Sequence, residues 1–320
     1  GPKEVVRRVE LRQLQYFLNV AKRQHVTHAA EEMHVAQSAV SRQIRLLEEE
    51  LGVDLFVPVG RNVQLTAAGK LFYAHGERIL GELGKAVQEV RELIDPEMGE
   101  IRLGFPHSPG VSLIPTVVAL FHKLHPNVKF TFSQGKYDVL IHDLLNNEID
   151  LAIISPLPDN HPDLSGDVLL TERLFAVVPQ GHPLAGEAEI RLEMLKNEPF
   201  VLFKEGYSLR AIVMDACARA GFRPNIGFEG EETDTIRGLV AAGIGVSLLP
   251  EMALAGSGVM MPAKVAVSDP PVTRTIGLIH RKGQKLPNVA QMFRRFLLDH
   301  FRDRRPDQGT SGTSGEKPAG

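Results

Sequence analysis

The sequence predicts an α + α/β fold: an N-terminal winged helix-turn-helix, a long linker helix, and a doubly wound α/β domain of two subdomains. Three patterns predict it. Apolar residues recur at helical spacing from Leu11 to Leu51 and alternate around 51–66. Helix-compatible sequence then continues from Ala67 to about Asp95. Beyond residue 99 a strand–helix–strand pattern occurs twice, which is typical of paired α/β subdomains.

The composition is that of globular domains, with 320 residues, 43% hydrophobic and 23% charged, enough for two or three domains. The net charge of -3 gives no indication of a nucleic-acid partner, so such a partner has to be argued from where the charges lie. No apolar run reaches the roughly 18 residues that cross a bilayer, and no secretory signal pattern is present. We therefore expect a cytoplasmic protein with no membrane partner.

Cys217 is the one cysteine of the chain. A single thiol forms neither an internal disulfide nor a cysteine-rich metal site, which fits a reducing compartment. The surrounding MDACARAG is typical of a helix, in which we expect a small buried core residue. Sensing of an oxidant usually needs a pair of thiols, so the sequence disfavours that function.

Three helices are predicted within 11–51, with Thr27 as the expected N-cap of the second. In the third, Val40, Ile44 and Leu47 fall on one arc at about 100° per residue. A separate arc carries one amide, two hydroxyls and two guanidiniums, with no carboxylate among them. Its residues are Gln37, Ser38, Ser41, Arg42 and Arg45.

An acid-free polar face of this kind suits a helix that enters the major groove of double-stranded DNA. Glutamine can bind adenine through two hydrogen bonds, arginine can bind guanine in the same way, and serine can bind phosphate. The alternative is the ordinary solvated face of an amphipathic helix. Two short helices before it and a hairpin after it favour DNA. The hairpin tip would place Arg61 in a minor groove or on a phosphate.

The stretch 11–69 resembles the N-terminal domain of LysR-type transcriptional regulators. The matching features are the alanine pair of THAAEEMH, QSAVSRQI, ELGVDLF and the R-x-x-x-L-T-x-A-G exit from the hairpin. The resemblance continues through G-x-P-x-S, IDLAII and VAAGIGVSLLP. It implies a homodimer or homotetramer on paired operator half-sites, with RNA polymerase as a further partner. It implies DNA contacts from Thr27, Gln37, Ser38, Ser41, Arg42 and Arg61, with Arg45 reaching a phosphate.

We place the DNA-binding domain at 9–66 and the linker helix at 67–96, ended by Pro96 and Gly99. An apolar seam with alternating three- and four-residue steps runs along the linker, the spacing of a coiled coil. The seam consists of Leu80, Leu83, Val87, Val90 and Ile94. A seam this short is marginal alone, so we expect a second copy of the chain to cover it. The alternative is packing on the chain's own core.

The segment 99–303 is predicted to be an effector-binding domain. IRLGF, a helix and VKFTF form one strand–helix–strand unit, and FVLF, a helix and IGFEG form another. The chain is expected to cross between subdomains near 164–169 and to return near 265–271. This two-crossover layout is that of periplasmic binding proteins, with ligand between the halves at the carboxyl ends of the strands. Subdomain I then spans about 99–166 and 269–303, and subdomain II about 167–268.

Both turns from the first strand to the first helix end near a serine, Ser108 and Ser208. As helix caps these serines would leave N–H groups facing the cleft, a natural carboxylate site, although plain capping explains them equally well. Arg210 is the expected partner of an acidic ligand. Thr233 opens a later helix and either caps it or contacts ligand. The resemblance to the LysR-type family implies that Gln134 and Gly135, after the second strand, and Ser155, after the third, also line the cleft. The full set expected to contact effector is Phe105, Ser108, Pro109, Gln134, Gly135, Ser155, Tyr207, Ser208, Arg210 and Thr233.

Within the LysR-type family, GFPHSPG, TFSQGKYDVL, ISPLP and FVLFKEGYSL resemble regulators of glutamate synthase genes more than regulators of aromatic catabolism. That resemblance implies a small effector such as 2-oxoglutarate or glutamate. Four acidic residues near the expected site would oppose a dianion unless they point away. They are Glu205, Glu229, Glu231 and Glu232.

No grouping of residues indicates an enzyme, a cofactor or a metal. Gly243 and Gly245 lack the G-x-G-x-x-G frame of a dinucleotide site, and Ser247 lacks the G-x-S-x-G frame of a hydrolase. His122 and His125 lie three residues apart without a third metal ligand. A solute-binding receptor or an enzyme on the same two-subdomain scaffold is the alternative function. The tail 304–320 is rich in Gly, Ser, Thr and Pro and is expected to be disordered.

Overall fold

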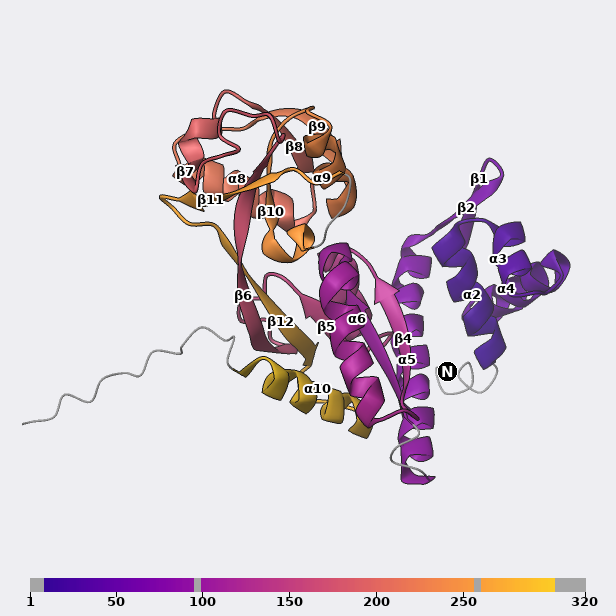
Figure 1. Cartoon of the computed structure of the whole chain (residues 1–320). Helices are drawn as coiled ribbons and strands as arrows, with labels where there is room; N and C mark the ends of the chain where they lie inside the picture. Colours follow the sequence, from indigo (N-terminus) through magenta and orange to yellow (C-terminus); the bar gives the residue numbers. More distant parts are fainter. Residues whose placement is uncertain (1–8, 95–98, 256–259, 303–320) are drawn as a thin grey trace, which may run out of the picture. The chain divides into compact units, whose positions relative to one another are not determined.

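The computed structural model describes residues 9–94, 99–255 and 260–302. These residues divide into two compact units, the first ending at Val87 and the second beginning at Gln88 (Figure 1). The first unit is helical with one hairpin, and the second combines helices with sheets, so the predicted fold class is confirmed. No helix in the described ranges is both long and apolar enough to cross a membrane. Pro96 and the tail 304–320 lie outside the described residues.

The first unit contains three short helices, a hairpin and most of a long helix. Their bounds are α2 Leu11–Arg23, α3 Val26–Glu32, α4 Gln37–Leu51, β1 Phe56–Val59, β2 Asn62–Leu65 and α5 Ala67–Ile94. The strands β1 and β2 pair antiparallel, with Val59 opposite Asn62. A two-residue turn therefore joins them, and Gly60 supplies the positive φ, 63°, that such a turn needs.

The core of the first unit is centred on Phe17 and Leu55, both buried. The ring of Phe17 lies 5.3 Å, centroid to centroid, from the rings of Phe56 and Phe72, so both the hairpin and α5 pack on α2. This packing requires Gly69, because a Cβ there would lie 2.1 Å from the Leu55 carbonyl oxygen. The glycine of the R-x-x-x-L-T-x-A-G pattern is thus explained by close approach of two backbones.

The start of α3 differs from the prediction. Its N-cap is His25, whose Nδ1 accepts a hydrogen bond from the His28 backbone N–H at 3.3 Å. The two imidazole rings stack with their centroids 4.0 Å apart. Because a histidine nitrogen caps the helix, Thr27 lies inside the first turn, and the prediction of Thr27 as the N-cap is wrong.

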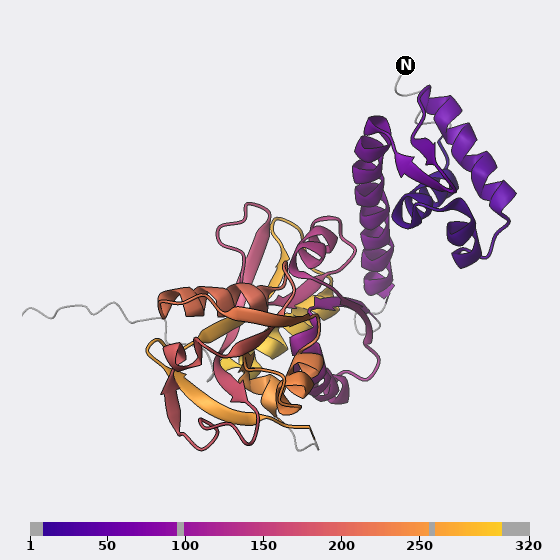
Figure 2. The same cartoon turned by 90° about the horizontal axis from the view of Figure 1, so that it is seen from above.

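The second unit contains two α/β halves with helices packed on the strands (Figures 1 and 2). The first half begins with β3 Glu100–Phe105, α6 His107–Leu124, β4 Lys129–Gln134, α7 Tyr137–Leu145 and β5 Leu151–Ile154. The long strand β6 Leu164–Val178 leads into the second half. There follow β7 Glu189–Arg191, η1 Leu192–Leu195, β8 Pro199–Phe203, α8 Ser208–Arg219, β9 Asn225–Gly230, α9 Thr233–Ala241, β10 Ser247–Pro250 and η2 Glu251–Leu254. The last elements are β11 Ala263–Ser268, β12 Thr273–Arg281 and α10 Asn288–His300.

Parallel pairing in each half brings strand ends and helix starts together. The strand β3 pairs in parallel with β4 and β5, and β8 pairs in parallel with β9. In both halves a helix follows the first strand, so α6 and α8 begin beyond the carboxyl ends of β3 and β8. The repeated strand–helix–strand pattern read from the sequence is therefore present.

The strands β6 and β12 connect the two halves (Figure 1). The strand β12 pairs antiparallel with β6 from Leu164 to Arg173, and from Leu174 onward β6 pairs with β10 and β11. The main sheet has the order β4-β3-β5-β12-β6-β11-β7. The change of partner lies beyond the crossover expected near 164–169, and the subdomain boundaries at 166 and 269 stay a prediction.

Cys217 lies on α8, fully buried in the same apolar cluster as Phe200 and Leu248. Burial raises the pKa of its thiol to about 12. Because the thiolate is the reactive form, we predict that a disulfide reagent at mildly alkaline pH modifies no thiol in the native chain. The same reagent should modify one thiol per chain in denaturant. Rapid modification of the native chain would contradict this burial.

Candidate functional site

The polar face predicted on α4 is exposed to solvent in the first unit. Its five members are all exposed: Gln37, Ser38, Ser41, Arg42 and Arg45. Val40, Ile44 and Leu47, which fall on the other arc of the helix, are buried. The N-cap, Ala36, has no side-chain oxygen, so no side chain caps the first N–H groups of α4. Those groups suit a phosphate.

Two further predicted DNA contacts are exposed on the same unit. Arg61 is the second residue of the hairpin turn, directly after Gly60. Thr27 lies in the first turn of α3. All seven predicted residues are thus accessible to a ligand of this unit, and their roles in binding DNA stay a prediction.

Most of the predicted seam on α5 is exposed. The exposed fractions are 43% for Leu83, 45% for Val87, 59% for Val90 and 83% for Ile94. Leu80 differs from them, because it is half-buried and packs against the core cluster of the first unit. Packing on the chain's own core therefore accounts for Leu80 but leaves between 43% and 83% of each of the other four seam residues exposed.

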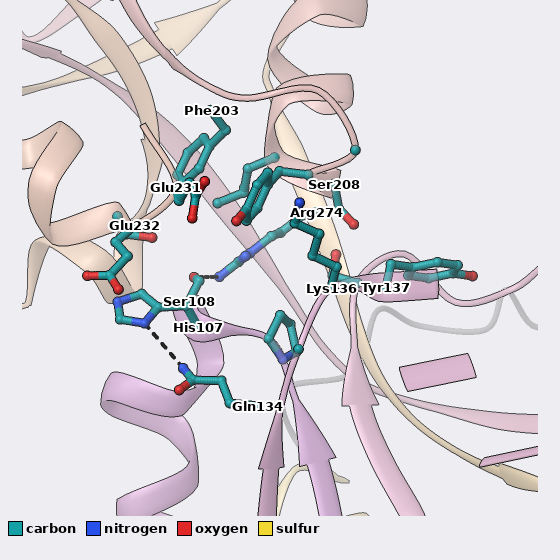
Figure 3. Close-up of a pocket in the computed structure, with 17 residues that line it drawn as sticks. His107, Ser108, Gln134, Lys136, Tyr137, Phe203, Ser208, Glu231, Glu232 and Arg274 are labelled. Atoms are coloured by element: carbon teal, nitrogen blue, oxygen red, sulfur yellow. Dashed lines mark hydrogen bonds between the residues drawn. The ribbon is translucent and has the colours of Figure 1, made fainter. Parts of the chain in front are cut away.

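A cavity of about 240 Å³ lies between the two halves of the second unit (Figure 3). Its walls come from the last residues of β4 and β8, from the segments that follow β3, β4, β5, β8 and β9, and from one residue of β12. The first half supplies Pro106, His107, Ser108, Gln134, Gly135, Lys136, Tyr137 and Ser155. The second half supplies Phe203, Gly206, Tyr207, Ser208, Leu209, Glu231, Glu232 and Thr233, and β12 supplies Arg274. The carboxyl ends of the parallel strands therefore surround the cavity, where ligands of doubly wound domains bind.

Most residues expected to contact effector line this cavity. They are Ser108, Gln134, Gly135, Ser155, Tyr207, Ser208 and Thr233. Phe105, Pro109 and Arg210 are not among the lining residues. Phe105 is buried, with its ring centroid 5.8 Å from that of Phe132, and Pro109 is buried in α6.

Neither serine caps its helix as expected. The N-caps of α6 and α8 are Pro106 and Tyr207, and neither makes a side-chain capping hydrogen bond. Ser108 and Ser208 lie inside the first turns, so the expectation of serine caps is wrong. Thr233 likewise follows its N-cap, Glu232. Both helices begin in the cavity wall, and no side chain caps their first N–H groups.

Arg210 is held outside the cavity wall. Its Nη1 donates to the Phe203 carbonyl at 2.8 Å and to the Glu229 carboxylate at 2.6 Å. Arg210 therefore ties α8 to the ends of β8 and β9. The arginine predicted to meet an acidic ligand is occupied by the protein itself.

The arginine of the cavity is Arg274, which was not among the predicted residues. Its side chain is 3% exposed, Nε donates to Glu172 at 2.5 Å, and Nη2 donates to Ser108 Oγ at 2.8 Å. Burial lowers the pKa of Arg274, and the Glu172 carboxylate opposes that shift. Figure 3 shows the guanidinium beside Ser108 among the lining side chains. The signal in the sequence was charge within two apolar strands, Arg274 in VTRTIGLI and the adjacent Glu172 and Arg173 in LLTERLF.

Two further polar atoms of lining residues have no hydrogen-bond partner in the described part of the chain, Ser155 Oγ and His107 Nε2. The Nδ1 of His107 lies 3.2 Å from the Gln134 amide nitrogen (Figure 3). With Nδ1 accepting from that amide, a neutral His107 carries its proton on Nε2, which is then a donor. Buried polar groups are normally paired, so both atoms are candidates for a ligand contact.

The cavity wall carries charges of both signs. Glu231 accepts a hydrogen bond from Lys204 at 2.8 Å, and this contact holds the pKa of Glu231 below its usual range. Lys136 lines the cavity and adds a weaker attraction to Glu231. Glu232 is also in the wall and is exposed. Of the acids expected near the site, Glu205 and Glu229 are not lining residues.

Comparison with known proteins shows the family. The LysR substrate binding domain family matches residues 95–302, and the lysR family of bacterial regulatory helix-turn-helix proteins matches residues 11–70. The chain belongs to the LysR family of transcriptional regulators. It is 44% identical over 293 residues to the transcriptional dual regulator GltC of Bacillus subtilis, covering 92% of this chain and 98% of GltC.

Solved LysR-family structures resemble the whole chain. CbnR, a LysR family transcriptional regulator, superposes with a TM-score of 0.72 at 25% identity, covering 93% of this chain and all of CbnR. Full-length CbnR in complex with its target DNA gives 0.71 at 25% identity, covering 92% of this chain and all of CbnR. A full-length OxyR variant from Pseudomonas aeruginosa gives 0.67 at 27% identity, covering 94% of this chain and 99% of OxyR.

As a LysR-family member, the chain is a DNA-binding transcriptional regulator with an effector-binding domain. The relatives are regulators, so the alternative of an enzyme on the same scaffold is rejected. Within the described ranges, no group of three or more His, Cys, Asp or Glu could hold a metal ion. The remaining question is which ligand the cavity takes.

Proposed function

We propose that the chain binds a small carboxylate in this cavity and that the bound acid sets how the regulator occupies or activates its promoter. The observation that carries the proposal is Arg274. Its Nε and Nη2 are held by Glu172 and Ser108, whereas Nη1 makes no hydrogen bond within the described residues. A fixed guanidinium with a spare N–H donor in a cavity wall is a strong receptor for a carboxylate.

Neighbouring groups support an anion at this position. The helices α6 and α8 begin in the cavity wall without side-chain caps, and helix N-termini favour negative charge. Ser155 Oγ and His107 Nε2 are unpartnered donors of lining residues. Lys136 adds a positive charge to the wall. These donors come from both halves, so an anion between them would contact both.

The acids that we propose are 2-oxoglutarate and glutamate. The cavity, about 240 Å³, is small beside the roughly 300–1,000 Å³ of pockets that hold drug-sized ligands, so it suits a small metabolite. The cleft motifs resemble those of regulators of glutamate synthase genes, and GltC is similar along nearly its whole length. Lys204 offsets the charge of Glu231, which reduces the opposition to a dianion.

Thermal unfolding of the full chain tests this site. A ligand at one hundred times its dissociation constant stabilises the native state by about 2.7 kcal/mol. We predict that 2-oxoglutarate or glutamate raises the melting temperature of the wild type. Arg274→Lys should lose most of that shift, because lysine keeps the charge but lacks the planar fork of donors. The matched control, Arg210→Lys, should keep the shift.

The carboxylate proposal would be contradicted if neither acid raised the melting temperature of the wild type. A shift that survives in Arg274→Lys but disappears in Arg210→Lys would place the acid at the other arginine. That result would contradict the assignment of the cavity.

We infer that α4 and the hairpin read operator half-sites in double-stranded DNA. Gln37 would bind a base edge, Ser38 and Ser41 would bind phosphates, and Arg42 a base or a phosphate. Arg61 would enter a minor groove or bind a phosphate, and Thr27 and Arg45 would contact the backbone. RNA polymerase would then be the partner at the promoter.

Substitution of Gln37 tests this docking. Gln37→Ala should cost roughly 1–3 kcal/mol of operator binding and relax base choice at one position, because a base-edge contact is lost. Arg61→Ala should instead weaken binding evenly across sequences. Anisotropy titrations with promoter DNA and single-base variants measure both effects. Gln15→Ala, an exposed glutamine on α2, is the control. Unchanged binding in both test variants would show that the docking is wrong.

We propose that the α5 seam pairs with the seam of a second copy in a homodimer, or in a homotetramer built from such dimers. Leu83→Glu with Val87→Glu should disperse the oligomer, because four like charges would meet at the seam. Sedimentation equilibrium measures the mass of the oligomer. Leu71→Glu, an exposed leucine of α5 outside the seam, is the matched control and should leave the mass unchanged. An unchanged mass in the double variant would contradict the seam.

A further inference from the structure

Glu172 forms a buried ion pair with Arg274 behind the cavity. The two side chains are 8% and 3% exposed, and their nearest atoms lie 2.5 Å apart. Glu172 is not itself a lining residue, whereas Arg274 is. The carboxylate therefore contacts the cavity only through the guanidinium that it holds.

The pair also lies where the two halves join. Arg274 on β12 stands directly opposite Glu172 on β6 in the sheet register. The next pair along, Thr273 with Arg173, is the last between these strands, and Leu174 already pairs with β10 of the second half. The ion pair is thus at the end of the β6–β12 ladder, beside the point where β6 changes partners.

The second oxygen of Glu172 binds another connecting segment. It accepts a hydrogen bond from the Met252 backbone N–H at 3.1 Å, in η2. The side chain of Met252 packs on the apolar core of the first half. The next residue, Ala253, is held by Arg237 of α9 in the second half, at 2.7 Å from its carbonyl. Glu172 therefore fixes a turn that contacts both halves.

On the other side of the guanidinium stands α6. Arg274 donates to Ser108 Oγ in the first turn of that helix, at 2.8 Å. A continuous series of hydrogen bonds therefore runs from α6 through Arg274 and Glu172 to η2. Each step joins segments that belong to different parts of the second unit, and the cavity opens onto the middle of the series.

We propose that Glu172 is a positioning residue of the effector site, which holds Arg274 for the ligand and transmits occupancy of the cavity to the crossing strands. This inference rests on the proposed function, because it takes Arg274 as the receptor of the effector carboxylate. Arginine that is fixed before binding loses less side-chain entropy when the acid arrives. The acid in turn adds a further bond to a guanidinium that is already tied to β6, α6 and η2, so binding makes these segments harder to open.

Glu172→Gln in the full chain tests the proposal, with glutamate and 2-oxoglutarate as the probes. The amide keeps the shape of the side chain but removes the charge that orients Arg274. We expect the affinity for the acid that binds the wild type to fall about tenfold or more in calorimetry. In hydrogen exchange, the acid should protect 164–178 and 273–281 in the wild type and protect them much less in the variant, even at saturation.

Asp167→Asn is the matched control. Asp167 lies on the same strand β6 and also pairs with an arginine, Arg294, at 2.8 Å, but neither residue lines the cavity. The affinity of Asp167→Asn for the acid, and the protection that the acid gives, should equal those of the wild type. If the loss of any ion pair on β6 lowered the affinity through general instability, both variants would bind the acid more weakly. If Glu172 positions Arg274, only Glu172→Gln should lose affinity and protection.

Ser108→Ala gives a second variant that removes a single hydroxyl, in case Glu172→Gln does not fold. This variant should bind the acid with lower affinity, and the acid should protect 273–281 less, because Arg274 loses its hydrogen bond to Ser108 Oγ. Wild-type affinity together with wild-type protection in these variants would overturn the role of Glu172. Failure of the wild type to bind either acid is a different result, which overturns the proposed function and this inference with it.

Discussion

The second unit, which contains the cavity, depends on one buried ion pair, Arg274 with Glu172. Moving two charges out of water costs several kcal/mol per ion, and the mutual attraction offsets this only where further hydrogen bonds satisfy both groups. Ser108 Oγ accepts from Arg274 and the Met252 N–H donates to Glu172, so of the guanidinium nitrogens Nη1 alone makes no hydrogen bond within the described residues. The partners stand opposite each other on β12 and β6, so the ion pair is compatible with the observed register of these two strands and holds Arg274 in the cavity wall.

The first unit shows how a chain with a net charge of -3 presents a surface suited to DNA. The polar face of α4 has no carboxylate, and the acids of that helix are gathered at its end. One of them, Glu48, is used structurally, because it accepts hydrogen bonds from the Leu55 and Phe56 N–H groups at 2.7 and 3.2 Å. The same contact ties α4 to the hairpin that carries Arg61. The local placement of charge, and not the net charge, thus produces the acid-free face of α4 that we propose binds DNA.

Much of the fold was predictable because it follows from the spacing of apolar residues. The burial of Val40, Ile44 and Leu47 agrees with a helical period, and Gly69 is explained by the close approach of α5 to Leu55. The cavity positions after β3 and β8 followed from the rule that carboxyl ends of parallel strands meet, whereas those at the ends of β4 and β5 came from the resemblance to the LysR-type family. Apart from that resemblance, these inferences need only local sequence and general topology.

The arginine of the cavity was not predictable in the same way. Arg274 and Glu172 lie about a hundred positions apart, and nothing local distinguishes a buried charge in a strand from an exposed one. Arg210 had the favourable position at the start of a helix, but Glu229 on the neighbouring strand already binds it. The caps of α3, α6 and α8 were missed because histidine, proline and tyrosine are weak signals for a helix start.

The most direct measurement is a crystal structure of the chain with glutamate or 2-oxoglutarate at saturating concentration. The carboxylate is predicted to lie at Arg274 Nη1, with a nitrogen–oxygen distance of about 2.7–2.9 Å, and with Glu172 still bound to the other side of the guanidinium. An acid bound to Arg210 or outside the cavity, with Arg274 contacting only Glu172 and Ser108, would contradict the central claim.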